Sequence, residues 1–198
     1  CARVRDGGVW CWGAMGGADG APRDLGREAQ HVAVSGDEAC LVLDGDVTCV
    51  SAVGDDVEEN RVAGIDDAAA VAVRDGGGCA RTATGVVACW SDGGDEAYLA
   101  EPVEGLAEVV RLAARGYETC ALRASPDEAQ RTVLCWGSSS KLKAPLLEPR
   151  VVTRDLHLGD GWGCLEGRDG LSCWGARPDG EEYRRDEQSP SFELIVGA

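Results

Sequence analysis

The sequence has few of the residues that catalytic and metal sites most often use. Its 198 residues include two histidines, His31 and His157, and one methionine. No CxxC pair occurs, and neither histidine has a second histidine at ligand spacing, so a structural zinc site is disfavoured. The glycine clusters GGADG, DGGG and DGGD lack a following Lys-Ser/Thr pair, and no nucleophile elbow is present. The sequence therefore predicts no catalytic residue, no bound cofactor and no metal ion.

Positive charge is also scarce. The chain has 19 Lys+Arg against 35 Asp+Glu, which gives a formal net charge of −16. A field of that sign repels phosphate groups, so nucleic acids and anionic membrane surfaces are disfavoured as partners. No apolar run is long enough to span a bilayer, so no membrane insertion is expected in this segment. We interpret the acidic surface as a source of solubility.

Cysteine, by contrast, is abundant, and its positions reveal a repeat. Ten cysteines form five sequence pairs, and the first member of each recurs about every 40 residues. Most of the second members begin the string CWG, and the variants are CVS at Cys49 and CWS at Cys89. We therefore expect one repeat domain over 1–198. Its predicted units are 1–29, 30–68, 69–108, 109–153 and 154–191, followed by a closing strand at 192–198.

Each unit has the pattern of several short strands. The runs VAV, VVAC and TVLCW are rich in β-branched residues, and Asp-Gly pairs separate the strands. Candidate fourth strands are RVAGI, EPVEGL and LEPRVV, where proline is tolerated because an outer strand has a free edge. Four short strands in about 40 residues are typical of a propeller blade. The sequence predicts an all-β propeller of about five blades, or part of a six- or seven-bladed ring; a β-solenoid is the alternative.

Counting inward from each cysteine pair places its two members opposite each other on a hairpin. Asp44-Gly45 make a two-residue turn in the second unit, and three-residue loops ending in Gly7 and Gly85 serve the first and third. The fourth unit has a longer loop, and the fifth closes on Arg168-Asp169. Opposed residues on a hairpin are close enough for a disulfide. The predicted bridges are Cys1–Cys11, Cys40–Cys49, Cys79–Cys89, Cys120–Cys135 and Cys164–Cys173.

Five bridges indicate an oxidising compartment, so we expect an extracellular or periplasmic location. The chain-entropy model gives each ten-residue loop roughly 2–3 kcal/mol of stabilisation.

The sequence begins without methionine and without a charged segment followed by an apolar one. These features predict a processed product or an excised domain.

Aromatic and acidic residues fall into three groups. One repeat position holds a tryptophan in four units, which predicts packing between blades: Trp12, Trp90, Trp136 and Trp174. The loops between the first and second strands are expected on one face of the ring and carry the candidate partner-binding residues: Asp37, Glu38, Tyr117, Glu118 and Trp162. Alternatively, Tyr117 and Trp162 pack against the next blade. Several acidic residues precede glycine and are interpreted as turn formers: Asp6, Asp44, Asp169 and Asp179.

Three strings carry a family resemblance: CARVRDGGVWCWG, YETCALRASPDEAQRTVLCWG and GWGCLEGRDGLSCWG. They resemble the regulator-of-chromosome-condensation (BNR-like) repeat, in the cysteine-bracketed form found in secreted bacterial proteins. The resemblance covers nearly the whole chain and is weakest in the second unit, where Val50 and Ser51 replace tryptophan and glycine. It implies a β-propeller, usually of seven blades, and no single activity. The best-known member is a nucleotide-exchange factor for a small GTPase, and others are binding platforms, including secreted inhibitors of β-lactamases.

We therefore expect a non-catalytic extracellular or periplasmic propeller that binds a protein partner through loops on one face. It would be monomeric or part of a larger chain. A guanine-nucleotide exchange factor is one alternative, although it requires a reducing compartment that five disulfides contradict. A secreted enzyme inhibitor is another, and so is a propeller hydrolase, which requires an acidic cluster near the central channel.

The segment FELIVGA at the end of the sequence resembles the first strand of a further unit. One interpretation is ring closure, in which this strand lies beside Cys1–Trp12 and completes the first blade. The other is truncation of the ring on both sides.

Overall fold

The computed structural model describes residues 1–17, 20–53, 56–91, 98–125, 132–137, 153–167, 170–175 and 194–195. These residues form β-strands, apart from turns, connections and one short 3-10 helix, η1 (Gly13–Met15). The strands build five antiparallel sheets of three or four strands, which confirms the all-β prediction and fits a β-propeller. The chain divides into two compact units, Cys1–Ala107 and Glu108–Ala198.

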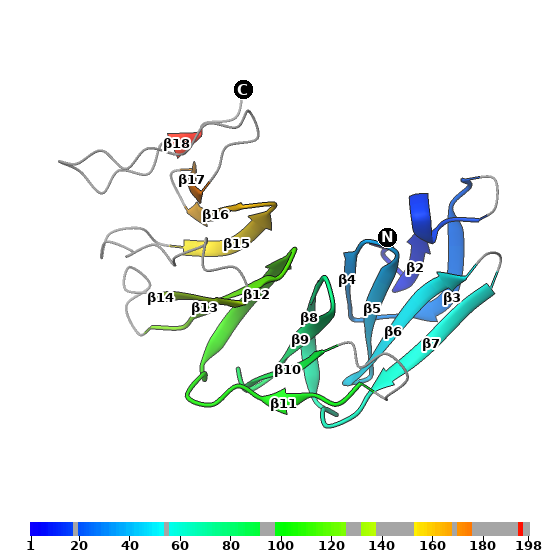
Figure 1. The fold of residues 1–198 in the computed structure, drawn as a ribbon, viewed down its shortest axis with the longest axis horizontal. Helices are drawn as coiled ribbons and strands as arrows, with labels where there is room; N and C mark the ends of the chain where they lie inside the picture. Colours follow the sequence, from blue (N-terminus) through cyan, green and yellow to red (C-terminus); the bar gives the residue numbers. More distant parts are fainter. Residues whose placement is uncertain are drawn as a thin grey trace. The chain divides into compact units, whose positions relative to one another are not determined.

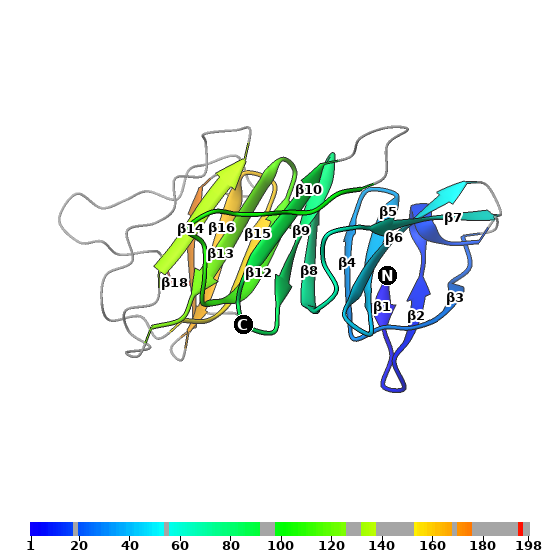
Figure 2. The ribbon, with the colours of Figure 1, turned by 90° about the horizontal axis from the view of Figure 1, so that it is seen from below.

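The first unit contains three sheets, whose strands are labelled in Figure 1 except for β1, which Figure 2 labels. The first sheet consists of β1 (Ala2–Arg3), β2 (Gly8–Cys11) and β3 (Arg23–Glu28). The second consists of β4 (His31–Ser35), β5 (Glu38–Leu43), β6 (Asp46–Val53) and β7 (Asp56–Val62). The third consists of β8 (Ala68–Arg74), β9 (Gly77–Thr82), β10 (Val87–Ser91) and β11 (Glu101–Pro102).

The second unit contains the other two sheets. The fourth sheet consists of β12 (Val109–Arg115), β13 (Glu118–Arg123) and β14 (Thr132–Gly137). The fifth consists of β15 (Thr153–Gly159), β16 (Trp162–Gly167), β17 (Gly170–Gly175) and β18 (Leu194–Ile195). In all five sheets consecutive strands pair as neighbours, as Figure 2 shows for β4, β5 and β6. This order is the meander of a propeller blade.

The hairpin turns form as their residues predict. Asp44 and Gly45 both have positive φ, 52° and 91°, as a two-residue turn of the Asp-Gly type requires. The three-residue loops end in Gly7 and Gly85, at φ 95° and 84°. In the fifth sheet Gly167 pairs with Gly170, as counting inward predicts. Arg168 and Asp169 themselves lie outside the described residues, as does Asp179.

The outer strands differ from the sequence prediction. RVAGI is only partly a strand, because β7 begins at Asp56 and ends at Val62. Its pairing with β6 extends to Val53, so the acidic run before Arg61 belongs to the strand. Charged residues are tolerated there because an outer edge is exposed to water. EPVEGL contributes only Glu101–Pro102, and LEPRVV lies outside the described residues.

Two residues of the C-terminal segment belong to the fifth sheet. Leu194 and Ile195 form β18, which pairs with β17 through Ser172 and Leu171. Of the two interpretations of segment 192–198, ring closure places it beside the first sheet, whereas these two residues extend the fifth. The physical reason is proximity along the chain, because successive strands usually pair with each other. The remaining residues of the segment lie outside the described part of the chain.

The cores lie between neighbouring sheets in each unit. Alternate residues of the second sheet point to opposite faces. One face adds Leu41 and Val50 to a cluster with Val9 and Cys11 of the first sheet. The other face, which includes Val42, joins a cluster with residues of the third sheet such as Val71 and Trp90. In the second unit, residues such as Leu122 pack with Leu165 and Trp174. Each sheet thus buries at least one face against a neighbour in its unit, as stacked repeats require.

Candidate interaction surface

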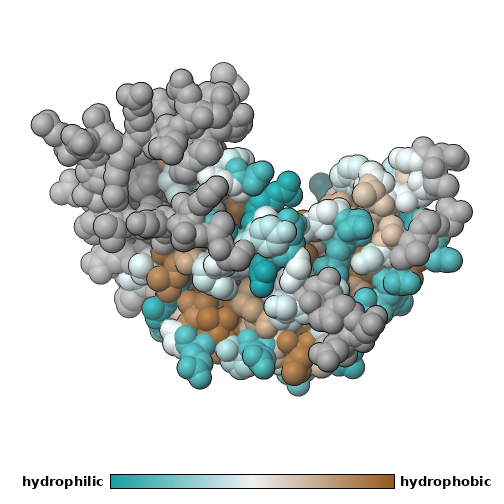
Figure 3. Space-filling view, in the orientation of Figure 1, coloured by the Kyte–Doolittle hydropathy of each residue, from teal (hydrophilic) through white to brown (hydrophobic). Residues whose placement is uncertain are grey.

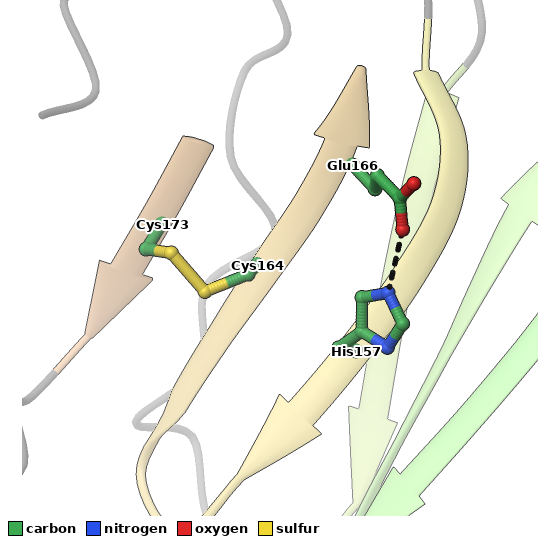
Figure 4. Close-up of a disulfide and its surroundings, with 4 residues drawn as sticks. All are labelled: His157, Cys164, Glu166 and Cys173. Carbon is green, nitrogen blue, oxygen red and sulfur yellow. Dashed lines mark hydrogen bonds and ion pairs between the residues drawn. A yellow bond between two sulfur atoms is a disulfide. The ribbon is translucent and has the colours of Figure 1, made fainter. Parts of the chain in front are cut away.

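All five predicted disulfides are present. In four of them the two cysteines lie directly opposite each other on adjacent strands, and in the first Cys1 directly precedes β1. The Cα atoms of all five pairs are 3.9 to 4.1 Å apart. The fourth unit keeps this arrangement across its longer loop, since Cys120 pairs with Cys135. Figure 4 shows the bridge between β16 and β17, formed by Cys164 and Cys173. Every bridge lies within one sheet, so the disulfides stiffen individual hairpins.

The disulfides also remove the thiolates that chemistry at these cysteines would need. Glu38, Cys40 and Cys49 have potential ligand atoms within 4.8 Å of one another. Both sulfurs are joined in a disulfide, so they cannot bind a metal ion as thiolates. This cluster is therefore a bridged hairpin with an adjacent carboxylate.

In the first unit, the turn between β4 and β5 carries Asp37 and Glu38. Asp37 is exposed, and Glu38 is half-buried. The hydroxyl of the buried Tyr98 donates a hydrogen bond of 2.9 Å to Glu38 Oε1. Because Tyr98 lies 60 residues further along the chain, no local sequence pattern could have predicted this contact. The hydrogen bond holds the Glu38 carboxylate in place, so Asp37 is the more accessible of the two candidate residues.

In the second unit, the turn between β12 and β13 carries Tyr117 and Glu118. Tyr117 is 57% exposed, which is unusual for a large aromatic residue. Glu118 begins β13 and is only 6% exposed. Burial argues against Glu118 as a contact residue, whereas Tyr117 is available to a partner.

Trp162 packs on its own sheet. It lies opposite Gly159 at the start of β16, and its indole occupies the space where a Cβ on Gly159 would stand. The same arrangement recurs where Trp90 covers Gly78. Trp162 is half-buried as a result. We therefore interpret Trp162 mainly as a packing residue that covers Gly159.

The repeat tryptophans divide into buried and exposed members. Trp90 and Trp174 are 2% and 9% exposed and join the cores between sheets. Trp136 is half-buried. Trp12 is 53% exposed, so the prediction that it packs between blades is wrong. Trp12 lies just beyond the end of β2 at Cys11 and before η1.

One repeat position is exposed in every described turn between first and second strands. It lies three residues before the first cysteine of a pair and is occupied by Asp37, Gly76, Tyr117 and Gly161. The first two belong to the first unit and the others to the second. The remaining candidates occupy less exposed positions next to it. The turn tip is thus exposed in these four repeats and presents a side chain to solvent at Asp37 and Tyr117.

The two histidines lie at sheet contacts. His157 Nε2 and Glu166 Oε2 are 3.4 Å apart on β15 and β16, both about half exposed (Figure 4). His31 is half-buried and contacts the third sheet. On the face shown in Figure 3, hydrophilic residues cover much of the described surface, and hydrophobic residues gather in a few patches. Within the described ranges, no helix has the length and hydropathy that crossing a membrane needs.

No protein-family model matches the chain, and neither does any curated protein. Solved structures do match. Prp20p from Saccharomyces cerevisiae aligns with 15% identity over 88% of this chain and 54% of its own, with a TM-score of 0.66. Human WBSCR16 aligns with 16% identity over 75% of this chain and 48% of its own, with a TM-score of 0.55.

A computationally designed protein, Ika8, aligns with 14% identity over 91% of this chain and 58% of its own, with a TM-score of 0.54. The chain thus spans about half the length of the solved structures it matches. Another crystal structure of Prp20, named there as yeast RCC1, gives the same TM-score of 0.66. At these identities the likeness concerns the fold alone, and it shows that this chain has an RCC1-like propeller fold.

Proposed function

We propose that the chain is a non-catalytic, protein-binding propeller of an oxidising extracellular or periplasmic environment. Within each unit the contact residues lie at turn tips between the first and second strands of a sheet, with Asp37 in the first unit and Tyr117 in the second. The single observation that supports this most strongly is the exposure of Tyr117, an aromatic side chain at the tip of a short turn. Exposed aromatic residues are enriched among the residues that dominate protein interfaces.

The scaffold suits such a role. Each turn joins two strands of a disulfide-bridged sheet, so its tip is held on a rigid base. Rigid presentation lowers the entropy that is lost on binding. Asp37 offers a carboxylate at the repeat position where Tyr117 offers a phenol. The repeat can thus vary its contact residues without changing its fold.

The comparisons support a protein partner in general terms. The Prp20p structure is described together with that protein's binding to Gsp1p and histones, and yeast RCC1 was solved bound to Kap60. For this chain, a net charge of −16 argues against binding to chromatin, because the DNA in chromatin is also negatively charged and repels it. The five disulfides favour an oxidising compartment, whereas a nucleotide-exchange factor for an intracellular GTPase would act in a reducing one.

A capture experiment tests this proposal. Wild-type chain and the variants Tyr117→Ala and Trp12→Ala would be immobilised and exposed to extracellular proteins, and the retained proteins would be quantified by mass spectrometry. Trp12→Ala is the matched control, because it removes an exposed aromatic residue from a different repeat position. We expect a partner retained by wild type and Trp12→Ala and reduced at least about tenfold by Tyr117→Ala, as for an interface hot spot. Equal retention by all three proteins would contradict the proposal.

A further inference from the structure

Two side-chain hydrogen bonds join the first strands of the second and third sheets. His31, at the beginning of β4, accepts a hydrogen bond through Nδ1 from the backbone N–H of Val71 in β8, at 3.3 Å. Ser35, at the end of β4, donates to Asp75 Oδ1 at 2.8 Å. In both pairs the partners are 40 residues apart, which is one repeat. Both ends of β4 are therefore held to the neighbouring sheet.

The contact at His31 depends on the protonation state of the imidazole. Nδ1 can accept a hydrogen bond only when it carries a lone pair, so the neutral ring must hold its proton on Nε2. In the imidazolium both nitrogens carry protons and neither can accept. Protonation would thus place an N–H group against the Val71 N–H and leave both without their partner. The Ser35 hydroxyl has no such dependence on imidazole charge.

The surroundings of His31 oppose a positive charge. Arg81 on β9 and Arg3 on β1 are the charged groups whose fields act on the ring. From β5 the opposed residue is the apolar Val42, and from β8 the contact is the Val71 backbone. Burial first, and then Arg81 and Arg3, lower the pKa of His31 below its ordinary value of 6.5.

We propose that His31 is an acid-sensitive contact between the second and third sheets. The neutral imidazole holds the beginning of β4 to β8, and protonation releases it. The Ser35–Asp75 hydrogen bond keeps the other end of β4 in place, so the opening is local.

The direction of the effect follows from the two states of the chain. The unfolded chain protonates His31 around its ordinary pKa of 6.5, whereas the folded chain resists protonation until a lower pH. The contribution of this contact to stability is therefore complete above pH 6.5. It is lost as the pH falls from there through the lower pKa of the folded state.

Hydrogen exchange at the Val71 amide tests the proposal. Its protection factor, which removes the intrinsic pH dependence of exchange, would be measured by NMR above and below the His31 pKa. We expect it to fall about tenfold in acid, the size of effect that one lost hydrogen bond produces. His31→Asn keeps an acceptor oxygen near the position of Nδ1 and does not titrate, so this variant should show no such fall.

Two further variants serve as controls. His157→Asn removes the only other histidine of the sequence and should retain the fall, because His157 lies in the second unit. Ser35→Ala removes the neighbouring hydrogen bond and should also retain the pH dependence. Equal Val71 protection at both pH values in the wild-type protein would overturn the proposal. So would a His31 pKa at or above 6.5 in the folded wild-type protein, a measurement that needs no variant.

Discussion

At the scale of single residues, the most informative feature is the pairing of tryptophan with glycine across a hairpin. Trp90 lies over Gly78, and Trp174 lies over Gly163. In each pair the indole fills the space that a side chain on the glycine would occupy. The large side chain of one strand is thereby accommodated by the smallest residue on its neighbour, and the pair is buried between sheets.

Gly78→Ala should therefore destabilise the protein. An added Cβ would meet a carbon of the Trp90 ring at 2.5 Å and the carbonyl oxygen of Ala72 at 2.9 Å. Such overpacking costs about 1–3 kcal/mol, which urea denaturation would measure. Gly17→Ala is the matched control, because its Cβ would stand 3.7 Å from its nearest neighbour, an ordinary contact. A loss below about 0.5 kcal/mol for Gly78→Ala would show that the indole moves aside freely.

Predictions for single residues succeeded only where the repeat itself determines the surroundings of the side chain. The repeat identified the tryptophan position, and Trp90 and Trp174 are buried as expected. It could not identify Trp12 as exposed, because exposure depends on what lies opposite and beside the strand. Nor could it identify the Tyr98 hydroxyl as the donor to Glu38, since that contact is made between distant parts of the chain.

At the scale of elements, the bridged hairpin is the repeating unit. Its turn chemistry sets the register, and the register brings the two cysteines together. Counting residues inward from the cysteines was therefore sufficient to predict all five bridges. The outer strands follow a different rule. Their limits depend on pairing with the preceding strand, so β7 and β18 differ from the sequence prediction.

The outer strands of the first unit also show how neighbouring sheets are joined at their edges. Arg27 on β3 forms an ion pair of 2.6 Å with Glu59 on β7. Arg23 on β3 donates to the backbone oxygen of Asp56 at 3.2 Å. Both contacts are exposed, so each contributes at most about 1 kcal/mol. Apolar packing between the sheets therefore dominates their association.

Removing one bridge should weaken the chain by a predictable amount. For Cys40→Ala/Cys49→Ala we expect a loss of roughly 2–3 kcal/mol in the free energy of unfolding, because the unfolded chain gains the freedom of a short loop. The midpoint of urea denaturation measures this loss, and circular dichroism checks that the strands remain. An unchanged midpoint would mean that the bridge adds no stability to a hairpin already fixed by its turn.

At the scale of the whole molecule, the chain is a series of sheets that pack on their neighbours within two units. The sequence repeat predicts the number and order of the sheets, because each repeat forms one sheet. It predicts one repeat domain over 1–198 and gives no sign of the two compact units, Cys1–Ala107 and Glu108–Ala198.

The central claim is that every sheet carries its own disulfide, on which the proposal of an oxidising environment rests. Mass-spectrometric mapping of the unreduced, denatured protein, with free thiols blocked and counted, tests it most directly. The account predicts no free thiol and the five bridges within sheets: Cys1–Cys11, Cys40–Cys49, Cys79–Cys89, Cys120–Cys135 and Cys164–Cys173. Ten free thiols, or bridges between different sheets, would contradict it.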